Sequence, residues 1–208
     1  MEFTLWLSFA AASTALLVMP GPTLLLVLSY AMTQGRRVAI ASALGVATGD
    51  LIAMTVSVIG LGALFLASAT AFTILKWIGA AYLFYLGVRM LMSSTESSPL
   101  MEKPANTSEG RVYRDLALVT ALNPKSNTFF IAFVPQFIDA NAAFAPQAAI
   151  LIVTFVAIAG VNALVFALGA NSIRAKITRP AVLTWLNRAG GATLIAMAAL
   201  TATLRRAT

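Results

Sequence analysis

Residues 16–30 read LLVMPGPTLLLVLSY, so Pro20, Gly21 and Pro22 interrupt an apolar run that is otherwise long enough to cross a membrane. A proline inside a helix removes a backbone hydrogen bond and clashes with the preceding turn, at a cost of roughly 3 kcal/mol. Two prolines around a glycine therefore predict a break within a membrane helix.

The composition around this stretch is that of an integral membrane protein. Of the 208 residues, 60% are hydrophobic and 10% are charged, whereas soluble domains have about 25% charged residues. The apolar runs cover residues 5–29, 38–66, 72–92, 116–137, 148–170 and 181–204. Each is close to or above the roughly 20 residues that span a bilayer as a helix. We expect an all-α protein with six transmembrane helices, the first of them retained rather than cleaved as a signal peptide.

Basic residues between these runs predict the orientation in the membrane. The odd-numbered loops hold Arg36, Arg37, Arg89, Lys103, Arg111, Arg114, Arg174, Lys176 and Arg179, and the other side holds Lys76, Arg205 and Arg206. Because cytoplasmic loops are enriched in Lys and Arg, the odd loops are predicted to be cytoplasmic and both termini periplasmic.

The chain reads as one transporter domain, residues 1–208, made of two halves. Residues 93–115 mix Ser, Glu, Pro and Lys, as a flexible cytoplasmic linker does, and separate residues 1–92 from residues 116–208. The stretch LKWIGAAYL at 75–83 resembles LNRAGGATL at 186–194, and Asp50 falls opposite Asn162 at nearly the same offset. Three helices per half give the halves opposite orientations, which predicts a 3+3 inverted repeat.

A second break opens the second half. Asn123 followed by Pro124 is a helix-start signal, placed inside the predicted fourth span. One interrupted segment at the start of each half indicates a binding site near the membrane midplane. The backbone groups freed by the breaks must be satisfied by protein, water or ligand. The alternative is that the prolines only kink packed helices.

Asp50 is the only acidic residue deep in a predicted span. A charge there costs on the order of 2.5–3.5 kcal/mol on insertion scales, so the side chain should face the interior and have a partner or a role. Lys125 or a bound cation could be the partner, and the carboxylate would suit proton transfer during transport. The alternative is a permanent pair with Lys125 or Arg188 that fixes helix packing.

Three further features carry two interpretations each. Lys125, beside the second break, could hold a substrate carboxylate or extend to the membrane surface. Asn162 is a candidate ligand, although such residues more often form interhelical hydrogen bonds. Gly45 and Gly49 lie on one helical face, where they most simply let another helix approach closely.

Several functional classes are disfavoured by what the sequence lacks. It contains no histidine and no cysteine, so a Ser-His protease and thiol chemistry are excluded. A single buried acid supplies neither an aspartyl protease pair nor a metal cluster. We expect no enzyme activity, no cofactor, no metal site and no nucleic-acid partner, and instead a carrier of a small polar or zwitterionic solute.

The motifs together resemble one known family, the lysine exporter (LysE) superfamily, and are most similar to its homoserine/threonine/lysine efflux branch, often called RhtB. They are Pro20-Gly21-Pro22, Gly45 through Gly49-Asp50, Ala81-Tyr82-Leu83 with Leu86-Gly87, Leu122-Asn123-Pro124-Lys125, Pro135-Gln136-Phe137 and Leu186-Asn187-Arg188. The resemblance implies a bacterial inner-membrane exporter of amino acids or close analogues, driven by the proton gradient, and is compatible with a homodimer.

The expected mechanism is alternating access between the two breaks. The substrate ammonium would approach Asp50, and its carboxylate Lys125 or the amides around Gly21 and Asn123. Protonation of Asp50 from outside would then release the substrate. Two other classes stay open: a passive channel for small polar solutes, and a membrane scaffold or assembly protein without flux.

Overall fold

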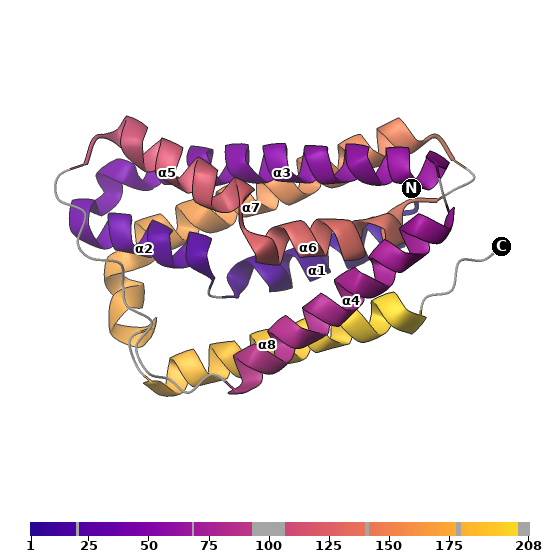
Figure 1. The fold of residues 1–208 in the computed structure, drawn as a ribbon. Coiled ribbons are helices and arrows are strands. Elements are labelled where there is room, and N and C mark those ends of the chain that lie inside the picture. The colour runs from indigo at the N-terminus through magenta and orange to yellow at the C-terminus, as the bar shows by residue number, and fades with distance from the viewer. Residues whose placement is uncertain (20, 68, 93–106, 140–141, 178–179, 204–208) are drawn as a thin grey trace.

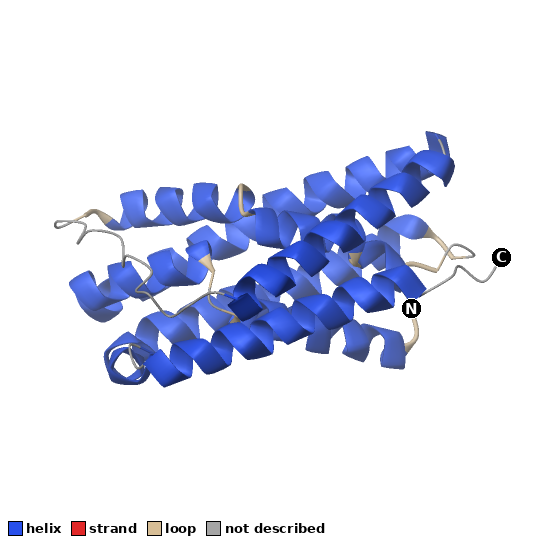
Figure 2. Ribbon diagram, turned by 60° about the horizontal axis from the view of Figure 1, so that its bottom comes forward, coloured by secondary structure: helices blue, strands red, loops and turns tan. Residues whose placement is uncertain are grey.

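The computed structural model describes residues 1–19, 21–67, 69–92, 107–139, 142–177 and 180–203, and all their regular structure is helical (Figures 1 and 2). The helices are α1 (Phe3–Val18), α2 (Pro22–Gln34), η1 (Gly35–Val38), α3 (Ala39–Ala67), α4 (Ala69–Met92), α5 (Glu109–Ala121), α6 (Pro124–Ala132), η2 (Val134–Phe137), α7 (Phe144–Ile177) and α8 (Pro180–Thr203). The prediction of an all-α protein is confirmed for this part of the chain. Pro20, residues 93–106 of the predicted linker, Arg179 and the basic pair at 205–206 lie outside it.

The first two helices are separated by a short extended segment. α1 ends at Val18, and Gly21, with extended dihedral angles, is the N-cap of α2. Pro22 occupies the first helical position, where its fixed φ suits a helix and its missing N–H costs nothing. The chain therefore starts a new helix at this point, and the amide of Leu25 donates to the Gly21 carbonyl at 3.0 Å.

α5 and α6 are separated in the same manner. α5 ends at Ala121, and Asn123 is the N-cap of α6, with its Oδ1 accepting from the amide of Lys125 at 3.0 Å. Pro124 again takes the first helical position. The N-termini of α2 and α6 are thus each built from a cap residue followed by proline.

The predicted linker differs from the structure at its end. Residues 109–115 form the first part of α5, because Ser108 accepts a hydrogen bond from the amide of Arg111 and caps the helix. Val112, Leu116 and Thr120, spaced four residues apart, are buried. This apolar stripe extends α5 well upstream of the run that composition alone marks as a span.

Small residues set the closest helix crossings. A Cβ at Gly45 would lie 2.6 Å from the Tyr113 carbonyl oxygen, and one at Gly49 would lie 2.6 Å from the Ala117 carbonyl oxygen. α5 therefore packs against α3 at backbone distance. α4 and α8 cross in a similar way at Gly87 and Gly191, and they run side by side in Figure 1.

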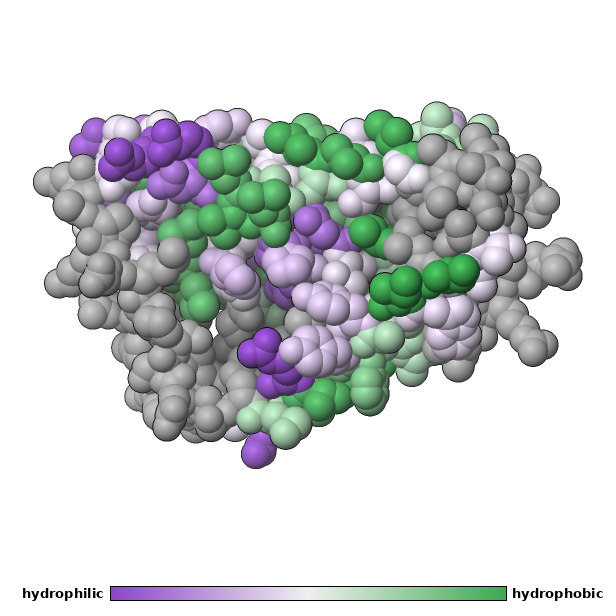
Figure 3. All heavy atoms as spheres, in the orientation of Figure 1, coloured by the Kyte–Doolittle hydropathy of each residue, from purple (hydrophilic) through white to green (hydrophobic). Residues whose placement is uncertain are grey.

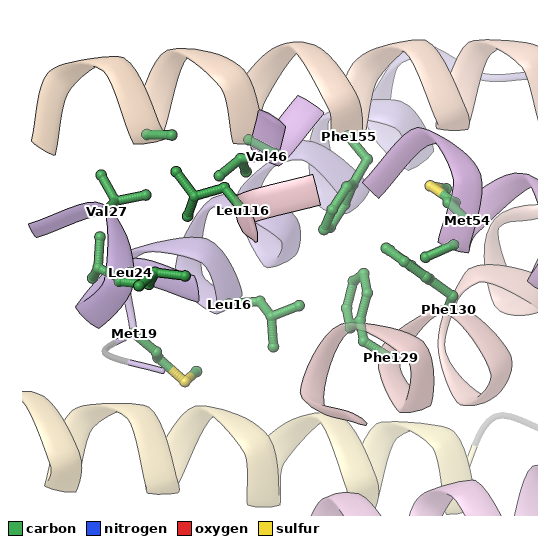
Figure 4. Close-up of a cluster of buried hydrophobic side chains, with 14 of the residues drawn as sticks. Leu16, Met19, Leu24, Val27, Val46, Met54, Leu116, Phe129, Phe130 and Phe155 are labelled. Carbon is green, nitrogen blue, oxygen red and sulfur yellow. The ribbon is translucent and has the colours of Figure 1, made fainter. Parts of the chain in front are cut away.

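The interior is filled by apolar side chains, with phenylalanines gathered on one side (Figure 4). Phe129 lies at the centre of this aromatic cluster, with its ring centroid 5.0 Å from Phe133, 5.9 Å from Phe155 and 6.4 Å from Phe9. Phe130 packs edge-on against Phe155 at 4.8 Å. This part of the core is apolar and fully buried.

The outer surface carries large apolar side chains along the long helices. Among the described residues, the stretches Pro22–Gly60 and Phe144–Ala170 are long and apolar enough to cross a membrane, and Phe3–Val18 is a shorter apolar helix. Val56 and Ile59 on α3 and Val153 on α7 are each more than 60% exposed. Figure 3 shows such residues along the face formed by α3 and α5, with hydrophilic residues at the end where α5 begins. Exposed apolar surface of this extent fits contact with lipid.

Candidate functional site

A cavity in the described part of the chain lies where the two interruptions meet. Its walls come from the end of α1, the start of α2, the middle of α3, the α5–α6 junction and the middle of α7. The polar side chains among its lining residues are Thr23, Asp50, Thr120, Asn123, Lys125, Ser126 and Asn162. Helix ends and polar side chains that are far apart in sequence therefore converge on one point of the interior.

Asp50 is the acidic group of this cavity. It lies on α3, is only 1% exposed, and its Oδ1 has no hydrogen-bond partner among the described residues. A buried carboxylate oxygen left unpaired costs free energy that the protein must recover elsewhere. Because Asp50 also lines the cavity, a cationic ligand or a proton there would satisfy it.

Lys125 is the basic group, and it binds backbone rather than a carboxylate. Its Nζ donates to the carbonyl oxygens of Leu16 at 3.0 Å and of Met19 at 3.1 Å. These carbonyls belong to the last turn of α1 and the residue that ends it, where no intrahelical partner is available. Gly21 leaves the space for this contact, since a Cβ there would lie 3.2 Å from Nζ.

Asp50 and Lys125 share the cavity without forming an ion pair. The ion pairs within 4.0 Å among the described residues join Arg37 to Glu109 and Arg114 to Asp115 at the protein surface. Arg188, the other partner considered for Asp50, is exposed on α8. In this conformation, neither base forms the permanent pair that would make Asp50 a packing residue.

Three hydroxyl-bearing residues in the cavity were missed by sequence reasoning. Thr120 and Asn123 both donate to the Oγ1 of Thr23, at 3.4 and 3.1 Å, and Ser126 is 3% exposed beside them. These bonds tie the α5–α6 junction to the start of α2. Their positions in the sequence could have indicated them, because each of the three lies within three residues of a proline or of the Asn123 cap.

Asn162 holds two helices together. Its Nδ2 donates to the Leu17 carbonyl at 3.2 Å, which joins α7 to the end of α1. This is the interhelical bond that is the more common role of such residues, although Asn162 also lines the cavity. The end of α1 is thus held by two side chains, Asn162 and Lys125.

The electrostatics of the cavity suit a zwitterion. The N-termini of α2 and α6 adjoin it at Gly21 and Asn123, and a helix N-terminus carries a partial positive charge from its free N–H groups. Asp50 supplies negative charge on α3. A small molecule with one carboxylate and one ammonium would find a complement for each.

The cavity is too small to hold such a molecule in this conformation. The space open to the centres of water-sized molecules is about 30 Å³, and one water needs roughly 10–15 Å³ by that measure. About two or three waters therefore fit, and a solute the size of an amino acid is larger than this space.

The site is thus a cavity inside a helical bundle, lined by helix ends and a buried acid. The chain belongs to the LysE type translocator family, whose sequence model matches residues 14–204. It is therefore a membrane-embedded translocator and not an enzyme, as the motif resemblance implied.

Relatives that match along the whole chain agree with this assignment. A homoserine/homoserine lactone efflux protein of Salmonella typhimurium is 35% identical over 207 residues, and its counterpart of Salmonella typhi is 34% identical over 207; both matches cover 100% of each chain. An uncharacterized membrane protein of Vibrio cholerae is 30% identical over 211 residues, covering 99% of this chain and 100% of the relative. No solved structure matches the chain significantly.

Proposed function

We propose that this protein exports amino acids or close analogues, of the homoserine, threonine or lysine type, across the bacterial inner membrane in exchange for protons. The observation that carries the proposal is the buried Asp50 carboxylate, whose Oδ1 has no hydrogen-bond partner among the described residues, in the cavity where the two helix interruptions meet. Intramembrane acids of this kind mark ion and substrate pathways. The names of the Salmonella relatives support an amino-acid-like substrate.

The binding pose follows from the charges around the cavity. The substrate ammonium pairs with Asp50, and the carboxylate is held by the N-termini of α2 and α6. Lys125 adds positive charge and has one N–H left, because the Leu16 and Met19 carbonyls take two of its three donors. Hydroxyls of Thr23 and Ser126 remain to contact the substrate side chain.

Proton coupling uses the same carboxylate. When the cavity opens outward, a periplasmic proton binds Asp50, which neutralises the carboxylate and releases the ammonium of the substrate. When the cavity opens inward, Asp50 loses the proton to the cytoplasm and can bind the next ammonium. One proton enters as one substrate leaves, so the proton gradient drives export.

Alternating access is supported by an arrangement of helices that fits a 3+3 inverted repeat of six spans. In this scheme α1 with α2 corresponds to α5 with α6, α3 to α7, and α4 to α8. α3 packs on α7 and α4 on α8, while α3 contacts α5 as α7 contacts α1. Asp50 on α3 and Asn162 on α7 line the same cavity, as the proposed equivalence requires.

The proposed orientation places the α2–α3 connection and the start of α5 in the cytoplasm. Arg36 and Arg37 lie in η1, and Arg37 pairs with Glu109 at 3.0 Å, so η1 and the start of α5 are at the same end of the molecule. Hydrophilic residues gather at this end in Figure 3, and the N-terminus is at the opposite end in Figure 1. The positive-inside rule then puts the N-terminus in the periplasm.

Purified protein in proteoliposomes tests the proposal. With an acidic lumen, external homoserine, threonine or lysine should accumulate inside above equilibrium, and a protonophore should abolish the accumulation. Downhill flux that ignores the pH difference would identify a passive channel instead. Absence of flux for all amino acids and for homoserine lactone would favour a scaffold.

A further inference from the structure

The end of α1 presents backbone carbonyls to the interior. α1 ends at Val18 and its C-cap Met19 is extended, so the last carbonyl oxygens of the helix have no intrahelical donor. The C-terminal end of a helix also carries partial negative charge. In transporters with broken helices, carbonyls at such ends coordinate the cation that is coupled to transport.

In this protein a side chain fills that position. The Lys125 ammonium lies 3.0 Å from the Leu16 carbonyl oxygen and 3.1 Å from that of Met19. It reaches α1 from the first turn of α6. Gly21 lies directly beside it: a Cβ there would be 3.2 Å from Nζ, close enough that the ammonium would have to shift by a few tenths of an ångström.

The charge pattern agrees with a fixed cation. Asp50 is the acid among the described cavity-lining residues, and Lys125 does not form an ion pair with it. The hydrogen-bonded partner of Lys125 is the end of α1, and the Asp50 carboxylate attracts the ammonium without an ion pair within 4.0 Å. This leaves Asp50 available to a mobile cation, either the substrate ammonium or a proton.

We infer that the ammonium of Lys125 is a built-in cation at the end of α1, in the position where a broken-helix transporter would otherwise bind a coupling metal ion. The protein therefore needs no sodium to hold α1 against α6. Sodium-independent transport rests on the proposed exporter function, whereas the structural role of the ammonium does not.

The structural role is tested by unfolding of purified protein in detergent. Unfolding is followed in choline chloride, sodium chloride or ammonium chloride at equal ionic strength. The proteins compared are the wild type, Lys125→Ala, Lys125→Arg and, as a control at an exposed position, Arg188→Ala. A ligand that binds only the folded state raises the unfolding midpoint. Lys125→Ala should unfold at a lower temperature in choline, and sodium or ammonium should shift its midpoint back toward that of the wild type.

For the wild type, for Lys125→Arg and for Arg188→Ala, the unfolding midpoint of each protein should not change between the three salts. An equal midpoint of Lys125→Ala in choline, sodium and ammonium would overturn the inference. Lys125→Met, which keeps most of the apolar stem, undergoes the same titration if the alanine variant does not fold.

Transport by the wild type supplies a second and separate test. Amino-acid flux in proteoliposomes should be unchanged when choline replaces sodium on both sides, and loss of flux without sodium would contradict the inference. If no amino acid is transported at all, the exporter proposal fails, and the unfolding titration still decides whether Lys125 replaces a bound cation.

Discussion

Replacing Gly49 by alanine should separate α3 from α5 and thereby slow transport. The added Cβ would lie 2.6 Å from the Ala117 carbonyl oxygen, 2.7 Å from the Cβ of Thr120 and 3.0 Å from the amide nitrogen of Ala121. Two of these atoms belong to the backbone, so no side-chain rotation relieves the clash. α5 must move outward by several tenths of an ångström, and Thr120 moves with it away from Thr23.

The energetic effect has two opposing parts. Forcing an extra carbon into a well-packed contact costs about 1–3 kcal/mol, while replacing glycine by alanine inside a helix contributes about 1 kcal/mol of stability. The change at Gly49 should therefore be neutral to destabilising by about 2 kcal/mol. Gly60, also on α3, is the matched control, because no described atom of another helix lies within 4 Å of its Cβ position. Its change to alanine should stabilise by about 1 kcal/mol.

Unfolding of both variants in a denaturing detergent gives the difference directly. Gly49→Ala should be less stable than Gly60→Ala by about 1–3 kcal/mol, and its proton-driven uptake into acidic proteoliposomes should fall. Gly60→Ala should transport like the wild type. If the two variants are equally stable and equally active, α5 does not pack on α3 as described.

Two further substitutions test the helix interruptions. Gly21→Leu should abolish transport, because its side chain would displace the Lys125 ammonium and fill a cavity of about 30 Å³. Uptake at the wild-type rate by this variant would show that the cavity is not on the transport path. Asn123→Ala removes the N-cap acceptor of α6 and the bond to Thr23, and loss of such a cap costs about 0.5–2 kcal/mol. Unfolding in detergent measures this change, and Asn123→Asp, which keeps the cap acceptor, should recover part of the stability.

The sequence predicted the helical class and most helix bounds because apolar run length is a strong local signal. The run at 38–66 corresponds to α3 (Ala39–Ala67) almost residue for residue. The start of α5 was missed because Glu109 to Asp115 is charged and amphipathic, so average hydropathy does not mark it as helix. The stripe beginning at Val112 is buried only when α5 packs in the folded bundle, chiefly against α3.

The site was predictable as a set of residues but not as a set of contacts. Asp50, Lys125 and Asn162 attract attention because polar groups are costly in an apolar span. Their partners could not be read from the sequence, since Lys125 and Asn162 bind the carbonyls of Leu16, Met19 and Leu17. Every residue has a backbone carbonyl, so the residue type does not indicate which carbonyls accept a hydrogen bond from a side chain.

Coupling of export to protons through Asp50 is measured by comparing wild type with Asp50→Asn in proteoliposomes with an acidic lumen. Asparagine keeps the size of the side chain and removes its charge and its ability to carry a proton. We expect the variant to insert and fold at wild-type levels but to show no accumulation of amino acid above equilibrium. Accumulation at the wild-type rate and level by Asp50→Asn would show that this carboxylate does not carry the coupled proton.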